Sequence, residues 1–322
     1  MKIKIFFSVL LVIAVLGVNT GIAEVKEIKV GILPTSSMLP LFLAQERGWY
    51  KEANLNVELI KMRGGATIIP AIVGDSIHIG YSNAVSIILA RSKGIDLQIV
   101  TNHVNEGYVK KDDEPGGYAT SSSGVLVLKE SNIKTPKDLE GKKVAVNAIK
   151  NIDWMAVWEW MEKNGADPKK VTWVEVGFPK MIPALMGKKV DAVEATEPFK
   201  TILRSKGASL LVNTLHDLHP GLTLACFVGK EEWISKNHET VEKFVSATSR
   251  GQQYLNTHPE ERNQLVTKYT KVTSDLAKKM TWHNWQSKVE IDSMKLWITL
   301  SQKHKLLKQA PDLDSLIYKT AK

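Results

Sequence analysis

Hydroxyl, amide, carboxylate and aromatic side chains recur where strand-like runs of this sequence give way to helix-like runs. The free N–H groups of a helix start favour anions and carbonyl oxygens, and carboxylates favour cations and N–H donors. Such junctions can therefore hold a small polar molecule. The residues that we expect to face a ligand are Thr35, Ser36, Ser37, Tyr81, Ser82, Asn83, Ser122, Ser123, Asn147, Asp153, Trp154, Phe178, Glu194 and Glu197.

Several of these side chains also have a purely structural explanation, and the sequence leaves both explanations open. The hydroxyls of residues 35–37 and the amide of Asn83 are good helix caps, so they can serve the helix start alone. The serines of residues 121–123 can form a flexible polar bend. Glu197 can be a favourable first-turn charge beside Pro198, a residue that is well tolerated at a helix start.

Aromatic residues gather in the helix-like stretch Ile152–Asn164. Trp154 and Trp158 are four residues apart and share one helix face. We expect Trp158 and Trp160 to lie in the core. Trp154, in the first turn, is expected to form a wall that stacks on a flat ligand. His103 is expected to be a loop histidine rather than a ligand contact.

Three carboxylates at these junctions set an expectation for the charge of the ligand. Asp153, Glu194 and Glu197 would repel a sulfonate or a nitrate ion and would favour an amine or an amidine-like ring. The sequence therefore favours a zwitterion or a nitrogen heterocycle, such as a pyrimidine, over a simple anion. A sulfonate remains an alternative.

The elements that must position these residues alternate between strand-like and helix-like runs. The strands predicted in the first half are Ile28–Leu33, Asn56–Met62, Ser76–Tyr81 and Leu97–Val104, and the helices between them are Leu39–Tyr50, Ala66–Gly74 and Asn83–Lys93. A second series follows the run LEGKKVAVN, and the chain after Glu231 is nearly all helical. This order predicts an α/β fold with mainly parallel sheets flanked by helices. In such sheets, ligands bind beyond the carboxyl ends of the strands.

Two extended stretches, near residues 118–128 and 220–229, separate the two series. If the helical tail packs on the first series, these stretches are the only covalent bridges between two lobes. We expect one lobe to contain residues 24–120 and 228–322, and the other to contain residues 121–227. The bridges would then form a two-strand hinge.

Composition limits the compartment and the class of partner. Residues 1–23 have a basic start, a short apolar run and small residues before a cleavage point, which predicts a secretory signal peptide, with a membrane anchor as the alternative. We expect a soluble, monomeric, periplasmic protein. The formal net charge of +9 is spread along the chain without a basic block, so no nucleic-acid partner is expected.

Motifs for catalysis or for cofactor binding are missing from the sequence. It contains no G-x-x-x-x-G-K, G-x-S-x-G or H-E-x-x-H motif. His216 and His219 could chelate a metal, but a Pro-Gly turn explains their setting more simply. The single cysteine, Cys226, lies in an apolar strand and is expected to be an inert buried thiol. We expect no cofactor and no metal.

Four stretches, in the same order and spacing, resemble the periplasmic solute-binding proteins of ABC importers. The branch that they resemble serves sulfonates, taurine, nitrate and thiamine-related pyrimidines. The four stretches are VGILPTSSMLPLFLAQERGWYKEANLNVELIKMRGG, PAIVGDSIHIGYSNAVSIILARSKGIDLQIV, LEGKKVAVN and ALMGKKVDAVEATEPF. One departure concerns residues 148–154, where bulkier groups and Asp153 replace the Gly-Ser-rich turn of many relatives. This departure disfavours a simple sulfonate cradle.

The resemblance implies a two-lobed fold that closes on a hinge, no catalysis, and delivery of a small solute to an inner-membrane permease and its ATPase. Two alternatives come from the same resemblance. The thiamine-pyrimidine synthases share this fold, but they are intracellular and carry a cysteine-rich iron-binding motif, whereas this sequence has one cysteine. The other alternative is a ligand-sensing domain for a membrane receptor.

Overall fold

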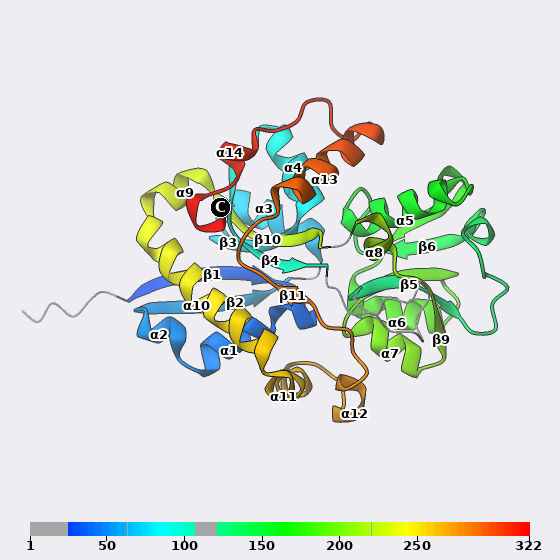
Figure 1. Ribbon diagram of the computed structural model, residues 1–322, viewed down its shortest axis with the longest axis horizontal. Coiled ribbons are helices and arrows are strands. Elements are labelled where there is room, and N and C mark those ends of the chain that lie inside the picture. The colour runs from blue at the N-terminus through cyan, green and yellow to red at the C-terminus, as the bar shows by residue number, and fades with distance from the viewer. Residues whose placement is uncertain (1–24, 63, 107–120, 220) are drawn as a thin grey trace, which may run out of the picture.

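The structure is a computed structural model that describes residues 25–62, 64–106, 121–219 and 221–322. Its two mixed β-sheets lie next to each other and are flanked by helices (Figure 1). The strand order is β11-β4-β10-β3-β1-β2 in the first sheet and β7-β6-β8-β5-β9 in the second. The predicted pair of α/β units is therefore confirmed. The predicted signal peptide, residues 1–23, lies outside the described residues.

The first lobe is the part of the chain built on the six-stranded sheet. Its strands are β1 (Lys26–Ile32), β2 (Leu55–Lys61), β3 (Ile79–Asn83), β4 (Leu97–Asn105), β10 (Thr223–Lys230) and β11 (Asn284–Trp285). Its early helices are η1 (Ser36–Met38), α1 (Leu39–Glu46), α2 (Trp49–Glu52), η2 (Gly65–Thr67), α3 (Ile68–Val73) and α4 (Ala84–Ser92). Its late helices are α9 (Glu231–Lys236), α10 (His238–Thr257), α11 (Pro259–Tyr269), α12 (Ser274–Ala277), α13 (Ile291–Lys303), α14 (Leu313–Leu316) and η6 (Lys319–Ala321).

The second lobe is built on the five-stranded sheet. Its strands are β5 (Ser123–Leu128), β6 (Lys143–Val146), β7 (Thr172–Glu175), β8 (Ala192–Thr196) and β9 (Ala208–Val212). Its helices are η4 (Pro136–Leu139), α5 (Ile152–Lys163), η5 (Pro168–Lys170), α6 (Phe178–Met186), α7 (Phe199–Ser205) and α8 (Thr214–Leu218).

The two strands at the lobe boundary make the sheets more mixed than the sequence predicted. β5 pairs antiparallel with β8 and β9, and β10 pairs antiparallel with β3 and β4. The second predicted bridge, residues 220–229, overlaps β10, which begins at Thr223 and pairs within the first sheet. The first predicted bridge lies partly outside the described residues, and β5 belongs to the second sheet.

A third segment, between α12 and α13, also contacts both lobes. The Thr281 N–H donates to Glu197 Oε1 of the second lobe at 3.2 Å, and Lys200 Nζ donates to Thr281 Oγ1 at 3.3 Å. On the side of the first lobe, the Trp285 indole N–H donates to the Ser37 carbonyl oxygen at 2.9 Å. The C-terminal part of the chain therefore contacts the lobe boundary, which the sequence did not predict.

Core positions follow the apolar periodicity of the sequence. Val241, Phe244 and Val245 of α10 are buried against the first sheet and α1, as the 3.6-residue period indicates. Cys226 and Trp160 are buried, as predicted, whereas Trp158 is only partly buried. In the described residues, no helix has the length and apolar character needed to cross a membrane.

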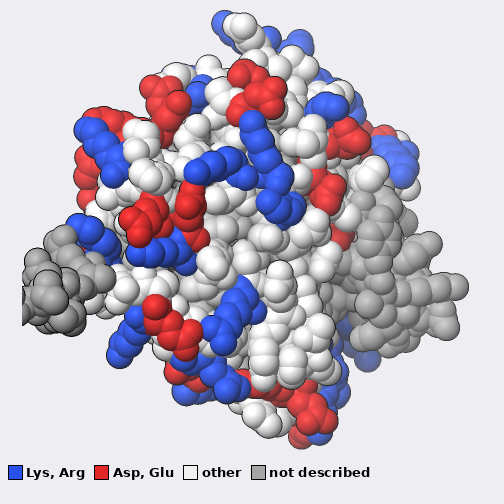
Figure 2. All heavy atoms as spheres, turned by 60° about the vertical axis from the view of Figure 1, so that its left-hand side comes forward, with Lys and Arg blue, Asp and Glu red and all other residues white. Residues whose placement is uncertain are grey.

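Charged side chains of both signs are interspersed over the end of the first lobe (Figure 2). The surface ion pairs of the first lobe include Arg47–Glu261 and Arg250–Glu52. This face has no stripe of one sign that would follow a nucleic-acid backbone.

Helix α10 crosses α1 so closely that Gly251 leaves no room for a side chain. A Cβ at Gly251 would overlap the Pro40 carbonyl oxygen. Alanine normally stabilises a helix interior by about 1 kcal/mol relative to glycine. Here we expect Gly251→Ala to destabilise the protein by about 1–3 kcal/mol, because overpacking outweighs propensity. Urea unfolding measures the change. Ser246→Ala, on the exposed face of the same helix, is the control, and a Gly251→Ala variant as stable as that control would contradict the packing argument.

Candidate functional site

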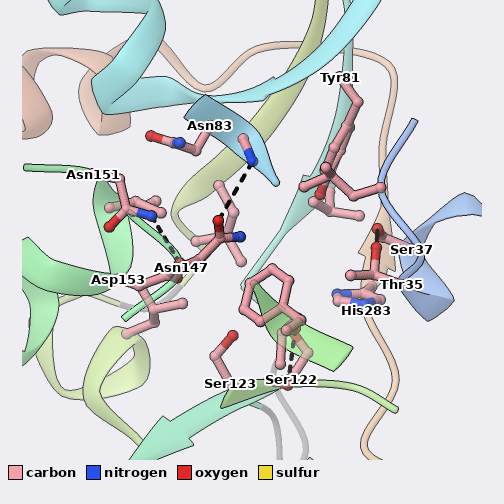
Figure 3. A pocket seen from close by; sticks show the side chains of 18 of the residues that line it. Thr35, Ser37, Tyr81, Asn83, Ser122, Ser123, Asn147, Asn151, Asp153 and His283 are labelled. Carbon is pink, nitrogen blue, oxygen red and sulfur yellow. Dashed lines mark hydrogen bonds between the residues drawn. The ribbon is translucent and has the colours of Figure 1, made fainter. Parts of the chain in front are cut away.

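A cavity lies between the two sheets and is lined from both lobes (Figure 3). The space open to the centres of water molecules is about 70 Å³. One water centre needs roughly 10–15 Å³, so the cavity suits a compact molecule. The lining residues are Leu33, Thr35, Ser37, Gly65, Tyr81, Ser82, Asn83, Val104, Ser122, Ser123, Asn147, Asn151, Ile152, Asp153, Phe178, Thr196, Leu215, Leu224 and His283.

Most residues that the sequence singled out as ligand-facing lie in this lining. The structure brings together Thr35, Ser37, Tyr81, Ser82, Asn83, Ser122, Ser123, Asn147, Asp153 and Phe178. Their ligand contact stays a prediction. The strand-to-helix rule located them, because the carboxyl ends of β1, β3 and β6 and the start of α5 meet at the cavity.

Ser36, Trp154, Glu194 and Glu197 do not line the cavity, although the sequence suggested that they face the ligand. Trp154 points elsewhere. Its ring lies 4.5 Å from that of Trp158 and 6.1 Å from that of His304, measured between centroids. Trp154 and Trp158 share one face of α5, as the four-residue spacing predicts. That face lies against His304, at the end of α13, rather than against the cavity.

Ser36 and Glu197 instead connect the two lobes. The backbone N–H and the hydroxyl of Ser36 both lie 3.2 Å from the carbonyl oxygen of Glu197. The Glu197 carboxylate accepts from Thr201 Oγ1 at 2.8 Å and from the Thr201 N–H at 3.1 Å. It therefore anchors the first turn of α7, which is the structural explanation that the sequence left open. Because it also accepts from the Thr281 N–H, its oxygens are occupied.

Amide and hydroxyl groups shape the walls of the cavity. Asn83 accepts from the Ser86 N–H and so caps α4 while also lining the cavity. Asn147, from the second lobe, accepts from the Gly65 N–H of the first lobe at 3.4 Å. The Thr35 and Ser37 hydroxyls lie 2.6 Å apart, and Thr35 makes no side-chain cap. In Figure 3, the three asparagines and Asp153 lie on one side of the cavity, opposite Thr35, Ser37 and His283.

The electrostatic character of the site comes from buried carboxyl groups. Asp153 lines the cavity and accepts from Asn151 Nδ2 at 3.0 Å. Glu194 is fully buried behind the wall, and neither of its oxygens has a hydrogen-bonding partner among the described residues. Burial raises the pKa of Asp153 to about 6, and it raises the pKa of Glu194 well above the ordinary range, with the Asp153 and Glu106 charges adding to that shift.

Among the described residues, one fully buried cation, Lys200, opposes this group of acids. Lys200 Nζ donates to the Ser121 carbonyl oxygen at 2.8 Å and to Asn213 Oδ1 at 3.3 Å. Its charge lowers the pKa of Glu106, yet burial outweighs that effect and raises this pKa to about 8. No Lys or Arg lines the cavity within the described part of the chain. The arrangement therefore disfavours an anion and favours a ligand with N–H donors or positive charge.

Two buried histidines lie beside the hydroxyl wall. His103 Nε2 lies 2.7 Å from the Ser37 carbonyl oxygen, and burial lowers the pKa of His103 to about 3. His103 belongs to β4 and does not line the cavity, so it is neither a loop residue nor a lining residue. His283 does line the cavity. The sequence offered no signal for it, because it follows no strand and belongs to no recognised motif.

A second interlobe contact joins α5 and α13 beyond the cavity. Lys303 Nζ lies 2.8 Å from both oxygens of Glu159 and 3.0 Å from Glu162 Oε2, and His304 also contacts Glu159. Glu159, Glu162 and His304 lie close enough to hold a metal ion. However, the Lys303 ammonium already contacts both carboxylates, so we interpret the cluster as an ion-pair contact between the lobes. We call it the α5–α13 contact.

Comparison with known proteins gives one matching family model, described as NMT1/THI5 like, over residues 35–114 and 116–262. A putative aliphatic sulfonates-binding protein of Bacillus subtilis is 24% identical over 251 residues, which are 76% of this chain and 70% of that protein. The Saccharomyces cerevisiae protein 4-amino-5-hydroxymethyl-2-methylpyrimidine phosphate synthase THI11 is 22% identical over 239 residues. The matched region is 70% of this chain but only 65% of the yeast synthase.

Among solved structures, the alkanesulfonate-binding protein SsuA from Xanthomonas axonopodis pv. citri, bound to MOPS, is similar in fold. It gives a TM-score of 0.76 at 17% identity, over 92% of this chain and 99% of that chain. The predicted two-lobed periplasmic-binding-protein fold and the predicted family resemblance are both confirmed.

The buried acids make stability depend on pH. A carboxyl group with a raised pKa in the folded state stabilises the fold below its unfolded pKa, and this stability is lost as the pH rises toward the folded pKa. We expect Glu194→Gln, which mimics the protonated acid, to have nearly the stability of the wild type at about pH 4.5. At about pH 8 it should be more stable by at least about 1 kcal/mol. Thermal unfolding across this pH range measures the difference.

Glu58→Gln, on the exposed side of β2, controls for the loss of one negative charge. If Glu194→Gln and Glu58→Gln changed stability equally at every pH, the account of the buried acids would be wrong.

The α5–α13 contact should favour a compact arrangement of the lobes. Half-exposed ion pairs contribute up to about 1 kcal/mol each, so we expect Glu159→Gln to populate wider forms. Small-angle scattering should then give a larger radius of gyration than that of the wild type. Glu239→Gln removes a surface pair within α10 alone and is the matched control. Equal radii for Glu159→Gln, Glu239→Gln and the wild type would contradict this role.

Proposed function

Because this chain belongs to the NMT1/THI5-like family, we propose that it is an extracytoplasmic solute-binding protein that captures a small molecule between its two lobes. The observation that supports this most directly is the cavity itself. It lies at the lobe boundary, and polar side chains from both sheets line it. A molecule held there contacts Thr35 and Asn83 of one lobe together with Asn147 and Asp153 of the other.

Capture works through closure of the hinge. A solute that contacts both lobes stabilises the closed form by the difference between its affinities for the closed and open forms. The Ser36–Glu197 and Asn147–Gly65 contacts join the two lobes, so they stabilise the closed form together with the solute. The moving bodies are the two lobes defined above, with β10 in the first lobe.

The ligand is a compact molecule rich in hydrogen-bond donors. The carboxylate of Asp153, and the lack of any Lys or Arg in the lining among the described residues, disfavour a sulfonate, even though similar proteins are named for sulfonates. A nitrogen heterocycle such as an aminopyrimidine, or a zwitterion, fits these groups better. Aromatic contact with a flat ring is available from Tyr81 and Phe178, which line the cavity.

The downstream partners follow from the same proposal. A binding protein of this kind would be exported by the predicted signal peptide, residues 1–23, into the periplasm. There it would act as a monomer and pass its solute to an inner-membrane permease driven by an ATPase. The face of the first lobe in Figure 2 carries interspersed charges of both signs, which disfavours nucleic acid as a partner there.

An enzymatic role is the second candidate, because several similar proteins are named as pyrimidine phosphate synthases. The chain has one cysteine, and it is buried in β10 away from the cavity. That cysteine is therefore unsuited to redox or metal chemistry at the site. Product formation distinguishes the two roles, since a binding protein returns its ligand unchanged.

A binding screen tests the proposed ligand class. The mature chain is mixed with taurine, nitrate, 4-amino-5-hydroxymethyl-2-methylpyrimidine and a set of amines, and melting temperature and calorimetry report binding. We expect the aminopyrimidine to bind more tightly than taurine or nitrate. Asp153→Asn should weaken aminopyrimidine binding about tenfold, because it removes a charged acceptor.

Asp191→Asn, which changes a carboxylate of the second lobe outside the cavity, is the control. Tight binding of taurine with no response to the pyrimidine or the amines would reverse the proposed ligand class. No response to any solute would contradict the proposed function itself.

A further inference from the structure

His283 reaches the cavity from outside the part of the chain that matches the family model, which ends at residue 262. It lies between α12 and β11, in the segment that contacts both lobes. The residue is buried like most of the lining, at 6% exposure. Figure 3 shows it beside Thr35 and Ser37, on the wall that faces the asparagines and Asp153.

A chain of two hydrogen bonds favours the tautomer of His283 in which Nε2 carries the proton. The Ser36 hydroxyl lies 3.2 Å from the Glu197 carbonyl oxygen and 3.3 Å from His283 Nε2. A carbonyl oxygen only accepts, so the Ser36 proton is used in the first bond. Both bonds exist together only if His283 Nε2 carries a hydrogen and donates it to Ser36 Oγ.

The other ring nitrogen is then a hydrogen-bond acceptor. Burial lowers the pKa of His283 to about 3, so the ring is neutral and Nδ1 keeps its lone pair. Nδ1 is buried and has no hydrogen-bonding partner among the described residues. A buried acceptor without a partner is costly, and a ligand that supplies a donor removes that cost.

We infer that His283 presents Nδ1 to the cavity as a hydrogen-bond acceptor, and that it selects solutes with an N–H or O–H donor at that wall. The ligand part of this inference depends on the proposed function. Ser36 and Glu197 belong to different lobes, so the contact between the lobes seen in the structure is what sets the tautomer. Because the Asp153 carboxylate lies on the facing wall, a ligand that fills the site would donate hydrogen bonds from two sides, one to His283 Nδ1 and one to Asp153.

The tautomer is measured directly on the full mature chain without added solute. Nitrogen-15 NMR of the histidine side chains distinguishes a protonated from an unprotonated ring nitrogen, and His283→Gln assigns the signal. We expect Nδ1 unprotonated and Nε2 protonated in the wild type. In Ser36→Ala, the population with a protonated Nδ1 should rise, because the Nε2 partner is gone. A protonated Nδ1 in the wild type overturns the inference.

Selection is tested with 4-amino-5-hydroxymethyl-2-methylpyrimidine and with two analogues, one without the amino group and one without the hydroxyl group. We expect His283→Phe to weaken binding of the parent compound about tenfold. One analogue should bind the wild type and His283→Phe equally, since it lacks the donor that Nδ1 accepts. His258→Phe, on an exposed surface of the first lobe, is the control.

The outcomes separate the two proposals. If His283→Phe weakens all three compounds equally, His283 does not select the donor and the inference fails, while solute capture stands. If none of the compounds binds the wild type, the proposed ligand class fails, and the NMR result alone decides whether Nδ1 is the acceptor.

Discussion

The contact between the two lobes depends on the hydrogen bonds that Glu197 accepts at the lobe boundary. A buried carboxylate is tolerated only when its oxygens have donors. Here the donors come from α7 of the second lobe and from Thr281, on the segment that returns from the first lobe. The carbonyl oxygen of the same residue accepts from Ser36 of the first lobe. One residue thus fixes the start of α7, holds the C-terminal segment in place and joins the β1 loop to the second lobe. Two of these elements, the β1 loop and the C-terminal segment, contribute Thr35, Ser37 and His283 to the cavity lining.

The chemistry of the site follows from an imbalance of buried charge. Asp153, Glu194 and Glu106 are buried near one another, and the charges of Asp153 and Glu106 raise the pKa of Glu194. Among the described residues, the positive charge that opposes them is that of Lys200. Burial disfavours ionisation, so Glu194 and Glu106 keep their protons to a higher pH than they would in water, and a raised pKa of about 6 leaves Asp153 as a carboxylate at neutral pH. The Asp153 carboxylate accepts hydrogen bonds from donors at the cavity, and no Lys or Arg lines the cavity among the described residues to pair with an oxyanion. The similar protein named for alkanesulfonates shares the fold, but a shared fold leaves specificity to the side chains that line the cavity.

Sequence reasoning predicted the sheet-and-helix architecture and most of the cavity lining, because strand periodicity and strand-to-helix junctions are local signals. Asn83 shows that capping and lining are compatible roles. The rest of the site could not be predicted from the sequence, because it depends on contacts between segments that are distant in the chain. Trp154 and Glu197 occupy promising positions along the chain, but their direction is decided by packing against α13 and the 278–290 segment, which are distant in sequence. The positions of His283 in the cavity wall and of Lys200 beside Thr281 depend on the packing of the C-terminal segment at the lobe boundary, which the sequence does not reveal.

The central claim is that a small solute is enclosed between two lobes that move relative to each other. Pulsed electron paramagnetic resonance tests it most directly, with spin labels at exposed Lys163 of α5 and Lys308 beyond α13, since the native thiol of Cys226 is buried. The account predicts that the solute with the largest melting shift narrows the distance distribution and shortens its mean. An unchanged distribution at saturating solute, with binding verified by calorimetry, would contradict it.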